Sequence, residues 1–238
     1  MDIQGKVALI TGGSKGIGLS IAESILAKGG KVALTSRNQG ELNSVVSRLN
    51  ESYPEQSLGV RSDARLYEEQ VEAVQKTIEK WGRLDVVIAN AGIGKFAPID
   101  EMTLDQWNDV IDINLTGAFY TIKASVEELK KSKGYYLSIA SLAGTNFFAR
   151  GAAYNASKFG LVGFTQAIML DLRKYGIKVS TIMPGSVATY FNGHVPTDED
   201  AWKIQPEDIG KMVVDLLEMP ARTLPSKIEV RPSIPPSR

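Results

Sequence analysis

Residues 7–18 read V-A-L-I-T-G-G-S-K-G-I-G, a short apolar run followed by a glycine-rich turn. The run 7–11 has the β-branched and apolar character of a buried strand, and helical spacing begins directly after the turn. Gly12, Gly16 and Gly18 allow a tight turn and close approach of a ligand, while the start of a helix offers free N–H groups to a phosphate. The spacing Gly-x-x-x-Gly-x-Gly differs from the standard Gly-x-Gly-x-x-Gly fingerprint. The turn favours dinucleotide binding, with a ligand-free glycine turn as the alternative.

The rest of the chain repeats this alternation. The ranges expected to be strands are 7–11, 32–35, 58–60, 86–89, 136–139, 179–183 and, at the sheet edge, 227–230. Helical spacing stands out in 17–27, 66–80, 104–129 and 152–172. Continuous apolar strands separated by helices indicate a parallel sheet covered on both faces. The pattern predicts an α/β fold: a single doubly wound Rossmann-type domain with a parallel sheet of about seven strands.

Composition and charge limit the classes of function. The chain has 238 residues, and 27 basic and 27 acidic side chains give a formal net charge of zero, with no sign of a nucleic-acid or membrane partner. It has no cysteine and a single histidine, His194, so neither thiolate chemistry nor a histidine-rich metal site is expected. No apolar stretch reaches the roughly 20 residues of a membrane span, and strand-like sequence begins close to the N-terminus. We therefore expect a soluble, cytoplasmic protein.

The sequence after the second expected strand bears on the choice of cofactor. An NAD-binding Rossmann unit has an acidic residue near this point, on the ribose 2′-hydroxyl. Here the position is Ser36, followed by Arg37, and Lys15 lies in the glycine turn. A carboxylate would repel a 2′-phosphate, whereas Arg and Lys hold it by charge-assisted hydrogen bonds. The sequence predicts NADP(H), with two solvated surface cations as the alternative.

Polar or small residues also follow the other expected strands. Asp63 follows the third and is predicted either to contact the adenine amino group or to cap a helix. Asn90 to Gly92 close the fourth strand, where small residues would let a cofactor lie against the sheet edge. Ser141 and Pro184 follow or close the fifth and sixth. Because ligands bind at the carboxyl ends of strands in open α/β sheets, these residues predict one ligand-binding edge.

Tyr154 and Lys158 lie four residues apart in the expected helix 152–172 and so share one face. A cation beside a phenol stabilises the phenolate, so the pair predicts a Tyr154 pKa pulled from about 10 toward neutrality and a proton donor or acceptor. Without the other motifs, the alternative is that Tyr154 and Lys158 are ordinary side chains on a solvated helix face. Asn114, within the expected helix 104–129, is a poor helix former, so either its amide has a task there or it is exposed.

Together these motifs resemble the short-chain dehydrogenase/reductase family, from about residue 6 to residue 187. The matching motifs, in the family's order and spacing, are Thr11-Gly12-x-x-x-Gly16-x-Gly18, Asn90-Ala91-Gly92, Asn114, Ser141, Tyr154-x-x-x-Lys158 and Pro184-Gly185. One departure is Ala89, where many members have a second asparagine. Basic residues at both Lys15 and Arg37 resemble the NADP(H)-preferring branch.

The resemblance implies a role for each catalytic residue. Tyr154 would be the acid/base and Ser141 would orient the substrate carbonyl. Lys158 would bind the nicotinamide ribose and lower the Tyr154 pKa, while Asn114 would hold a water in a proton relay. The expected cofactor-binding residues are Gly12, Ser14, Lys15, Gly16, Ile17, Gly18, Ser36, Arg37, Asp63, Ala64, Asn90, Ala91, Gly92, Tyr154, Lys158, Pro184, Gly185, Val187 and Thr189.

The resemblance also divides the predicted domain, 1–238, into a cofactor half, about 1–135, and a catalytic and substrate-binding half, about 136–238. The residues expected to bind substrate are Ser141, Phe147, Phe148, Tyr154, Tyr190 and Phe191; for one of Phe147 and Phe148, core packing is the alternative. His194 is expected to be an ordinary residue of the substrate loop. Asp198, Glu199 and Asp200 form an acidic cluster, expected near the pocket mouth, that would repel an acidic carrier protein.

The reaction implied is hydride transfer by an NADP(H)-dependent carbonyl reductase or alcohol dehydrogenase. Its substrate would be a small apolar or aromatic ketone, aldehyde or secondary alcohol. One alternative is a 3-oxoacyl-[acyl-carrier-protein] reductase, which shares the catalytic residues; another is a non-catalytic NADP(H)-binding sensor or scaffold. The expected helices 104–129 and 152–172 are apolar on more than one face, which predicts a homodimer or homotetramer.

Overall fold

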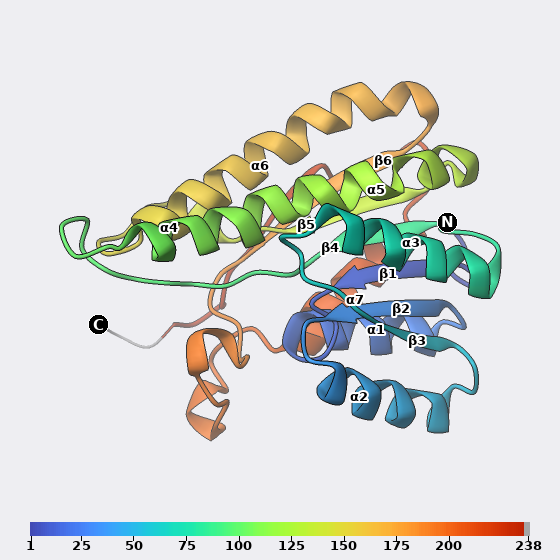
Figure 1. The fold of residues 1–238 in the computed structure, drawn as a ribbon, viewed down its shortest axis with the longest axis horizontal. Helices are drawn as coiled ribbons and strands as arrows, with labels where there is room; N and C mark the ends of the chain where they lie inside the picture. The colour runs from blue at the N-terminus through green and yellow to red at the C-terminus, as the bar shows by residue number, and fades with distance from the viewer. Residues whose placement is uncertain (236–238) are drawn as a thin grey trace.

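The sheet at the centre of the molecule has seven parallel strands in the order β3-β2-β1-β4-β5-β6-β7 (Figure 1). In the computed structural model, which describes residues 1–235, the strands are β1 Val7–Thr11, β2 Lys31–Ser36, β3 Ser57–Arg61, β4 Val86–Ala89, β5 Tyr135–Ile139, β6 Lys178–Pro184 and β7 Lys227–Val230. Each predicted strand is present with ends within one residue of those expected. The predicted Rossmann-type fold is confirmed; residues 236–238 of the predicted domain lie outside the described residues.

Burial along the strands explains the sheet order. β1 and β4 are buried at every position, as central strands covered on both faces must be. β7 alternates between exposed and half-buried residues, and its exposed positions are Lys227 and Glu229, charges that protect a sheet edge from further pairing. Pro184 of β6 pairs with Val230 of β7, so the chain after β7 emerges beside the chain after β6.

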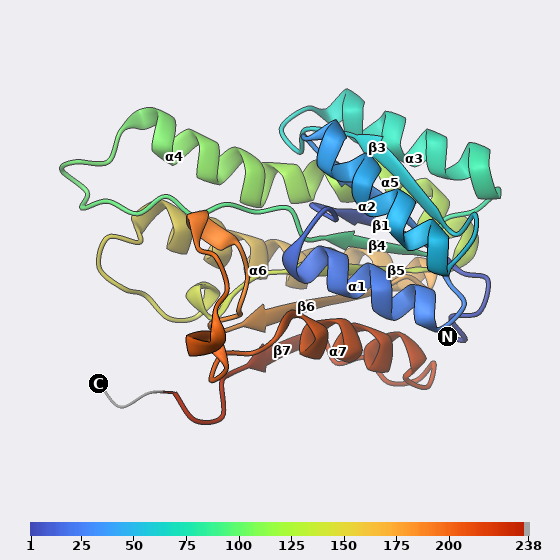
Figure 2. The same cartoon turned by 90° about the horizontal axis from the view of Figure 1, so that it is seen from below.

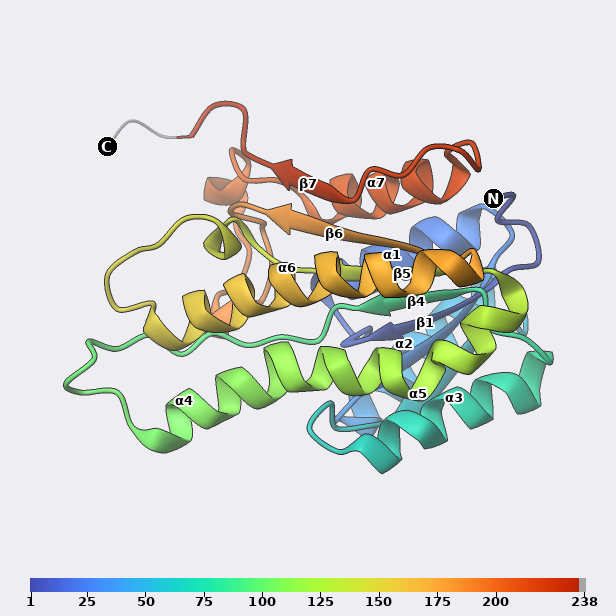
Figure 3. The same ribbon diagram turned by 90° about the horizontal axis from the view of Figure 1, so that it is seen from above.

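Helices cover both faces of the sheet. They are α1 Gly16–Ala27, α2 Gln39–Ser52, α3 Tyr67–Trp81, α4 Leu104–Ile111, α5 Gly117–Ser132, α6 Ala152–Leu172 and α7 Pro206–Glu218. Figure 2 shows α1, α2 and α7 on one face, and Figure 3 shows α3, α4, α5 and α6 on the other. Within residues 1–235, no helix is both long enough and apolar enough to cross a membrane.

Three helices differ from the sequence expectation. α2 was not singled out, because Leu42 and Leu49 are its only buried residues and its apolar stripe is therefore narrow. α7 was also not singled out, although Pro206 starts it and Gln205 forms a capping box with Asp208. The single helix expected over 104–129 is interrupted by a π-helical turn, Asp112–Thr116, between α4 and α5.

Candidate active site

The glycine turn after β1 packs against the end of β4 and leaves the start of α1 open. Gly12 has a φ of +66°, and a Cβ atom there would lie 3.0 Å from Cα of Ala91. A Cβ atom on Gly18 would lie 2.5 Å from both Nδ2 of Asn90 and the carbonyl oxygen of Gly12. Lys15 precedes α1 without a side-chain hydrogen bond to the helix, so the N–H groups of the first turn are left for an anion. The turn therefore has the form of a phosphate cradle.

A cavity of about 810 Å³ runs from this cradle along the ends of the neighbouring strands. Its size is in the range of cofactor sites. The residues predicted to bind a cofactor that line it are Gly12, Ser14, Lys15, Gly16, Ile17, Ser36, Arg37, Asp63, Ala64, Asn90, Ala91, Gly92, Tyr154, Lys158 and Thr189. Gly18 is buried and lies outside this lining. The cradle and its surroundings fit a dinucleotide.

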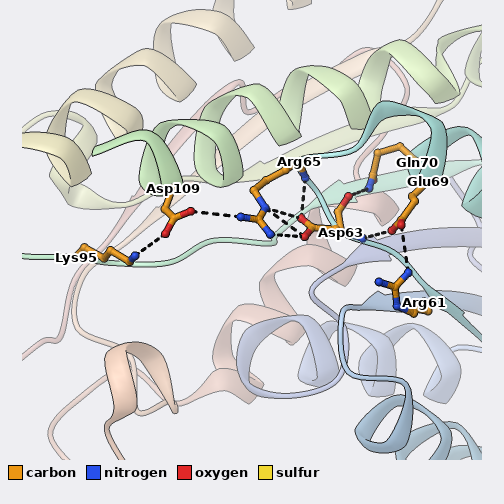
Figure 4. A network of polar contacts seen from close by, with 7 residues as sticks. All are labelled: Arg61, Asp63, Arg65, Glu69, Gln70, Lys95 and Asp109. Carbon is orange, nitrogen blue, oxygen red and sulfur yellow. Dashed lines mark hydrogen bonds and ion pairs between the residues drawn. The ribbon is translucent and has the colours of Figure 1, made fainter. Parts of the chain in front are cut away.

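Two basic side chains that line this cavity, Arg65 and Lys95, belong to a chain of ion pairs (Figure 4). The guanidinium of Arg65 lies 2.7 Å from Asp63 and 3.3 Å from Asp109. The ammonium of Lys95 lies 2.5 Å from Asp109. Neither Lys95, Arg65 nor Asp109 was predicted, because they come from three separate segments that only the fold brings together. Their charges are largely balanced within the network.

Two other cations of the cavity, Lys15 and Arg37, make no ion pair with any residue in 1–235. The hydroxyl of Ser14 lies 3.2 Å from Oγ of Ser36 and 3.4 Å from Oε2 of Glu41. Glu41, in the first turn of α2, was not predicted, and it lines this part of the cavity as well. This part of the cavity therefore has two cations without an ion-pair partner in residues 1–235 and two hydroxyl groups, a combination that suits an anionic group.

Asp63 lies at the end of β3 and does not cap a helix. Its carboxylate accepts hydrogen bonds from the main-chain N–H and the guanidinium of Arg65. The residue before α3 is Leu66, which has no side-chain cap. Hydrogen bonds from Arg65 hold the Asp63 pKa below its ordinary value. The helix-cap alternative is therefore wrong, and the adenine contact stays a prediction.

Ser141, Tyr154 and Lys158 meet at the carboxyl end of β5. Oγ of Ser141 accepts a hydrogen bond of 3.1 Å from the N–H of Ala143. Tyr154 and Lys158 lie at the start of α6, and Nζ of Lys158 is 5.8 Å from the centre of the Tyr154 ring. Nζ of Lys158 donates a 3.0 Å hydrogen bond to the carbonyl oxygen of Ile139. The side chains predicted to be catalytic are thus adjacent.

The ionisation of this pair differs from the sequence prediction. Burial raises the pKa of the Tyr154 phenol, while the Ser141 hydroxyl acts in the opposite direction. Burial also lowers the pKa of Lys158 to about 8. The predicted lowering of the Tyr154 pKa is wrong for this arrangement, because desolvation outweighs the nearby cation.

Asn114 occupies the π-helical turn and is 1% exposed, so the exposed-residue alternative is wrong. Its Nδ2 donates to the carbonyl oxygen of Ile93 at 2.9 Å and to Oγ of Ser157 at 3.0 Å, and its Oδ1 accepts from the N–H of Ile93 at 2.8 Å. The amide therefore ties the chain after β4 to α6. A π-helical turn at such a point is typical of functional sites.

A second cavity, of about 890 Å³, adjoins the first. The two cavities share Ile17, Ile139, Ala140, Tyr154, Thr189 and Phe191 as lining residues. Tyr154 therefore stands where the cavities meet. Of the predicted site residues, those lining the second cavity are Ile17, Ser141, Phe148, Tyr154, Pro184, Gly185, Val187, Thr189 and Phe191. Tyr190 lines the first cavity instead.

Residues 6–200 match the family described as short chain dehydrogenase. The chain belongs to this family. It is similar to an uncharacterized oxidoreductase of Staphylococcus saprophyticus, with 36% identity over 98% of this chain and 99% of the relative. It is also similar to trans-4-hydroxycyclohexanecarboxylate dehydrogenase of Sinomonas cyclohexanicum, with 33% identity over 89% of this chain and 85% of the relative.

A solved structure shares the fold of this short-chain dehydrogenase along almost its whole length. An alcohol dehydrogenase from the archaeon Thermococcus sibiricus, complexed with 5-hydroxy-NADP, matches with a TM-score of 0.92 and 27% identity over 99% of this chain and 100% of the other. The family and the enzyme class predicted from the sequence, an oxidoreductase acting on CH–OH and C=O groups, are confirmed.

Aromatic rings cover the Tyr154 side chain in this short-chain dehydrogenase. The Tyr154 ring centre lies 5.5 Å from that of Phe96 and 5.6 Å from that of Phe191. Phe148 packs on Phe96 at 5.8 Å. Gly94 leaves room for the cluster, because a Cβ atom there would lie 2.7 Å from both Phe96 and Phe191. Phe96 was not predicted, since the three phenylalanines come from segments far apart in the sequence.

Phe147 and Phe148 do not pack in the core, so that alternative is wrong for both. Phe148 is partly exposed and lines the second cavity. Phe147 is 87% exposed and lines neither cavity. Both lie on the loop between β5 and α6, and both are exposed. The side chain of Phe147 is therefore poorly placed to form a substrate wall.

The acidic cluster expected near the mouth is smaller than predicted. Asp198 and Glu199 are exposed, but Asp200 is only 5% exposed. Its two carboxylate oxygens lie 2.5 Å from Nε2 of His194 and 2.5 Å from Nζ of Lys203. Hydrogen bonds from Lys203 and His194 hold the Asp200 pKa well below its ordinary value. The expectation of three repelling carboxylates is wrong, because this one is paired inside the loop.

Proposed function

We propose that this short-chain dehydrogenase is an NADP(H)-dependent carbonyl reductase and alcohol dehydrogenase for small apolar or aromatic ketones, aldehydes or secondary alcohols. One observation carries the proposal: Tyr154 lies where a cavity with a phosphate cradle meets a second cavity that holds Ser141. A proton donor at such a junction reaches both a cofactor and a substrate.

When bound, NADP(H) supplies the hydride for reduction and accepts it in oxidation. Ser141 donates a hydrogen bond to the substrate oxygen and orients the carbonyl. Because burial raises the Tyr154 pKa, the phenol holds its proton at neutral pH and gives it to the substrate oxygen during reduction. Lys158 lies beside the ring, and its charge favours the phenolate left after that transfer. Alcohol oxidation reverses the proton movement.

NADP(H) is the cofactor in this proposal. Lys15 and Arg37 line the cofactor cavity with no counter-ion among residues 1–235, whereas Arg65 and Lys95 are already paired. Uncommitted cations of this kind hold a 2′-phosphate by charge-assisted hydrogen bonds. The Thermococcus alcohol dehydrogenase, complexed with 5-hydroxy-NADP, supports the same choice.

The walls of the second cavity support a ring-shaped or apolar substrate. Phe148, Phe191 and Trp202 line it with Tyr154. Aromatic faces of this kind accept planar or alicyclic rings. The Sinomonas relative is named a trans-4-hydroxycyclohexanecarboxylate dehydrogenase, which supports the inclusion of ring alcohols among the substrates.

A substrate panel tests the proposal. NADPH oxidation is followed with aromatic and alicyclic ketones, an aldehyde, a diketone and an acyl thioester, and NADP⁺ reduction with the matching secondary alcohols. We expect turnover of ring ketones and alcohols with NADP(H). A protein that binds NADPH tightly and turns over none of them would contradict the proposal and favour a cofactor-binding sensor.

We also propose that the enzyme assembles as a homodimer or homotetramer and acts in the cytoplasm. Phe119 of α5 and Phe159 and Leu170 of α6 are large apolar side chains left exposed on neighbouring helices. Exposed apolar surface of this kind is typical of an interface between copies. Light scattering at micromolar concentration tests the assembly, and a monomer would contradict it.

A further inference from the structure

The second cavity carries charged groups that the proposed reaction does not use. His194, Lys203 and Arg231 line it, and no Asp or Glu from residues 1–235 does so. These three side chains come from the segment between β6 and α7 and from the chain after β7. The lining of the second cavity therefore includes basic side chains and, within residues 1–235, no carboxylate.

Two of these side chains share one counter-ion. Asp200 lies outside the cavity lining, and its carboxylate is 2.5 Å from both His194 and Lys203. One carboxylate thus faces one permanent cation and one imidazole. The trio is neutral with a neutral imidazole and positive with a protonated one, so it presents no net negative charge to a substrate.

Arg231 has unused hydrogen-bonding capacity. Its side chain is 57% exposed, and Nη2 donates a 2.8 Å hydrogen bond to Oε2 of Glu229. A guanidinium has five N–H donors, and Glu229 is the one side-chain partner of Arg231 among residues 1–235, so most of the donors remain for a second anion. Glu229 does not line the cavity, whereas Arg231 does. Arg231 is thus the member of this ion pair that lines the cavity.

The strand order sets the spacing between Arg231 and the catalytic hydroxyl. Ser141 follows β5 and Arg231 follows β7, with β6 between them (Figure 3). Neighbouring strands lie about 4.8 Å apart, so the two backbones are separated by on the order of 10 Å. The N–H of Gly185 donates to the carbonyl oxygen of Val230 at 2.8 Å, which holds the chain after β7 against this edge. Ser141 and Arg231 thus line one cavity from strand ends two positions apart in the sheet.

We propose that the second cavity selects substrates carrying a carboxylate on the far side of a ring from the reacting carbonyl, with Arg231 as the residue that recognises it. The inference rests on the proposed reductase function and narrows its substrate class to oxo and hydroxy carboxylic acids. A guanidinium fork matches the two oxygens of a carboxylate, and the aromatic walls hold the ring between. The paired Lys203 and Asp200 add no net negative charge that would oppose the carboxylate.

Matched substrates and variants test the inference. The probes are 4-acetylbenzoate and its neutral counterpart 4-acetylbenzamide, compared by kcat/KM with NADPH. The variant Arg231→Gln removes the charge, and Arg48→Gln is the control. Arg48 forms an equivalent surface pair with Glu23, at 2.9 Å and 55% exposed, but lines neither cavity.

We expect the acid to be the better substrate and Arg231→Gln to lower its kcat/KM about tenfold, the effect of one charge-assisted hydrogen bond. The amide should change less than about twofold, and Arg48→Gln should change neither. Added salt should weaken the preference for the acid. Equal use of acid and amide, or an equal loss for both in Arg231→Gln, would overturn the inference while leaving the reductase function intact.

Binding separates the inference from catalysis. Benzoate and benzamide have no ketone, so calorimetry on the NADP⁺-saturated protein reports recognition without turnover. Tighter binding of benzoate that is lost in Arg231→Gln supports the carboxylate site even if no ketone is reduced. Equal binding of the two, or benzoate binding that Arg231→Gln leaves unchanged, overturns it.

Discussion

The cofactor side and the substrate side of the cleft are built in different ways. The cofactor side consists of strand ends and the turns directly after them, and its tightest contacts are between main chains, as at Gly12 and Ala91. The substrate side is built from side chains on three distant segments, around Phe96, Phe191 and Arg231. Figure 2 shows the segment before α7, in orange, beside the end of β6. One side is fixed by the sheet and the other by loops.

This difference separates what the fold imposes from what an individual member of the family can vary. Replacing Gly12 places a Cβ atom 3.0 Å from Cα of Ala91 and forces another residue into a φ of +66°, a conformation that favours glycine. Replacing Phe148 or Arg231 changes a loop side chain that is already partly exposed. Substrate choice therefore can change without disturbing the cofactor cradle.

The largest effect is expected at the junction of the two sides. Tyr154→Phe removes the proton donor but keeps the ring packed against Phe96 and Phe191. Turnover should fall about 100- to 10,000-fold, the usual contribution of one general acid, while NADPH binding is retained. Steady-state kinetics and fluorescence titration with NADPH measure both. The control is Tyr175→Phe, which lines neither cavity; near-normal turnover of Tyr154→Phe would end the assignment.

The next largest effect concerns stability. Burial lowers the pKa of Lys158 from the ordinary lysine value of 10.5 to about 8 in the fold. Between these values the unfolded chain binds more protons than the folded one, so the stability contributed by this position rises with pH. The penalty for burying the ammonium is fully present below about pH 8 and absent above about pH 10.5, and amounts to about 3 kcal/mol.

Lys158→Met should therefore gain stability over the unmodified protein at pH 7, less whatever the lost hydrogen bond to Ile139 contributes. The gain should shrink as the pH rises from 8 toward 10.5. Urea unfolding of both proteins at about pH 7, 8.5 and 10 measures the difference in their free energies of unfolding across this pH range. A difference that stays constant or grows with pH would contradict the lowered pKa.

The sequence predicts the cofactor side of the cleft better than the substrate side. The strands and the cofactor residues follow from local patterns, because a buried strand and the turn after it are continuous in sequence. Tyr154 and Lys158 are readable for the same reason, as one helix face. Phe96 and Arg231 are not, since nothing in their neighbourhoods predicts that Phe96 packs on Tyr154 or that Arg231 lines the second cavity.

The reversed pKa of Tyr154 shows a second limit. The sequence reveals that a cation stands four residues away, but not how much water the phenol keeps. The desolvation that raises its pKa comes from the surrounding fold, including the aromatic contacts with Phe96 and Phe191. The π-helical turn at Asn114 is a similar case, because its hydrogen bonds to Ile93 and Ser157 depend on two other segments. Local chemistry predicts the participants, and tertiary burial decides their ionisation.

The third prediction tests the cofactor side alone. Removing the Arg37 charge as Arg37→Gln should weaken NADPH binding roughly 10- to 150-fold, the cost of one charge-assisted hydrogen bond, with little change for NADH. Arg61→Gln is the control, because Arg61 lies nearby at the end of β3 but pairs with Glu69 and does not line the cavity. Fluorescence titration with both cofactors measures the shift. Equal weakening of NADPH and NADH, or a wild-type preference for NADH, would contradict the 2′-phosphate assignment.

The smallest effect on activity is expected on the substrate side. The sequence predicts that Phe147 and Phe191 both bind substrate, but the structure gives them different surroundings. Phe191 packs on the Tyr154 ring at 5.6 Å, whereas Phe147 is 87% exposed and lines neither cavity. An aromatic contact adds about 0.5–1.5 kcal/mol beyond area burial, so Phe191→Leu should lower kcat/KM for an aromatic ketone about 2- to 10-fold. Its effect on an aliphatic ketone should be smaller, because no ring is then stacked in the cavity. Phe147→Leu, made as the matched change, should leave both values within about twofold. Comparable losses in the two variants would show that the loop after β5 reaches the substrate, and would place Phe147 back among the substrate-binding residues.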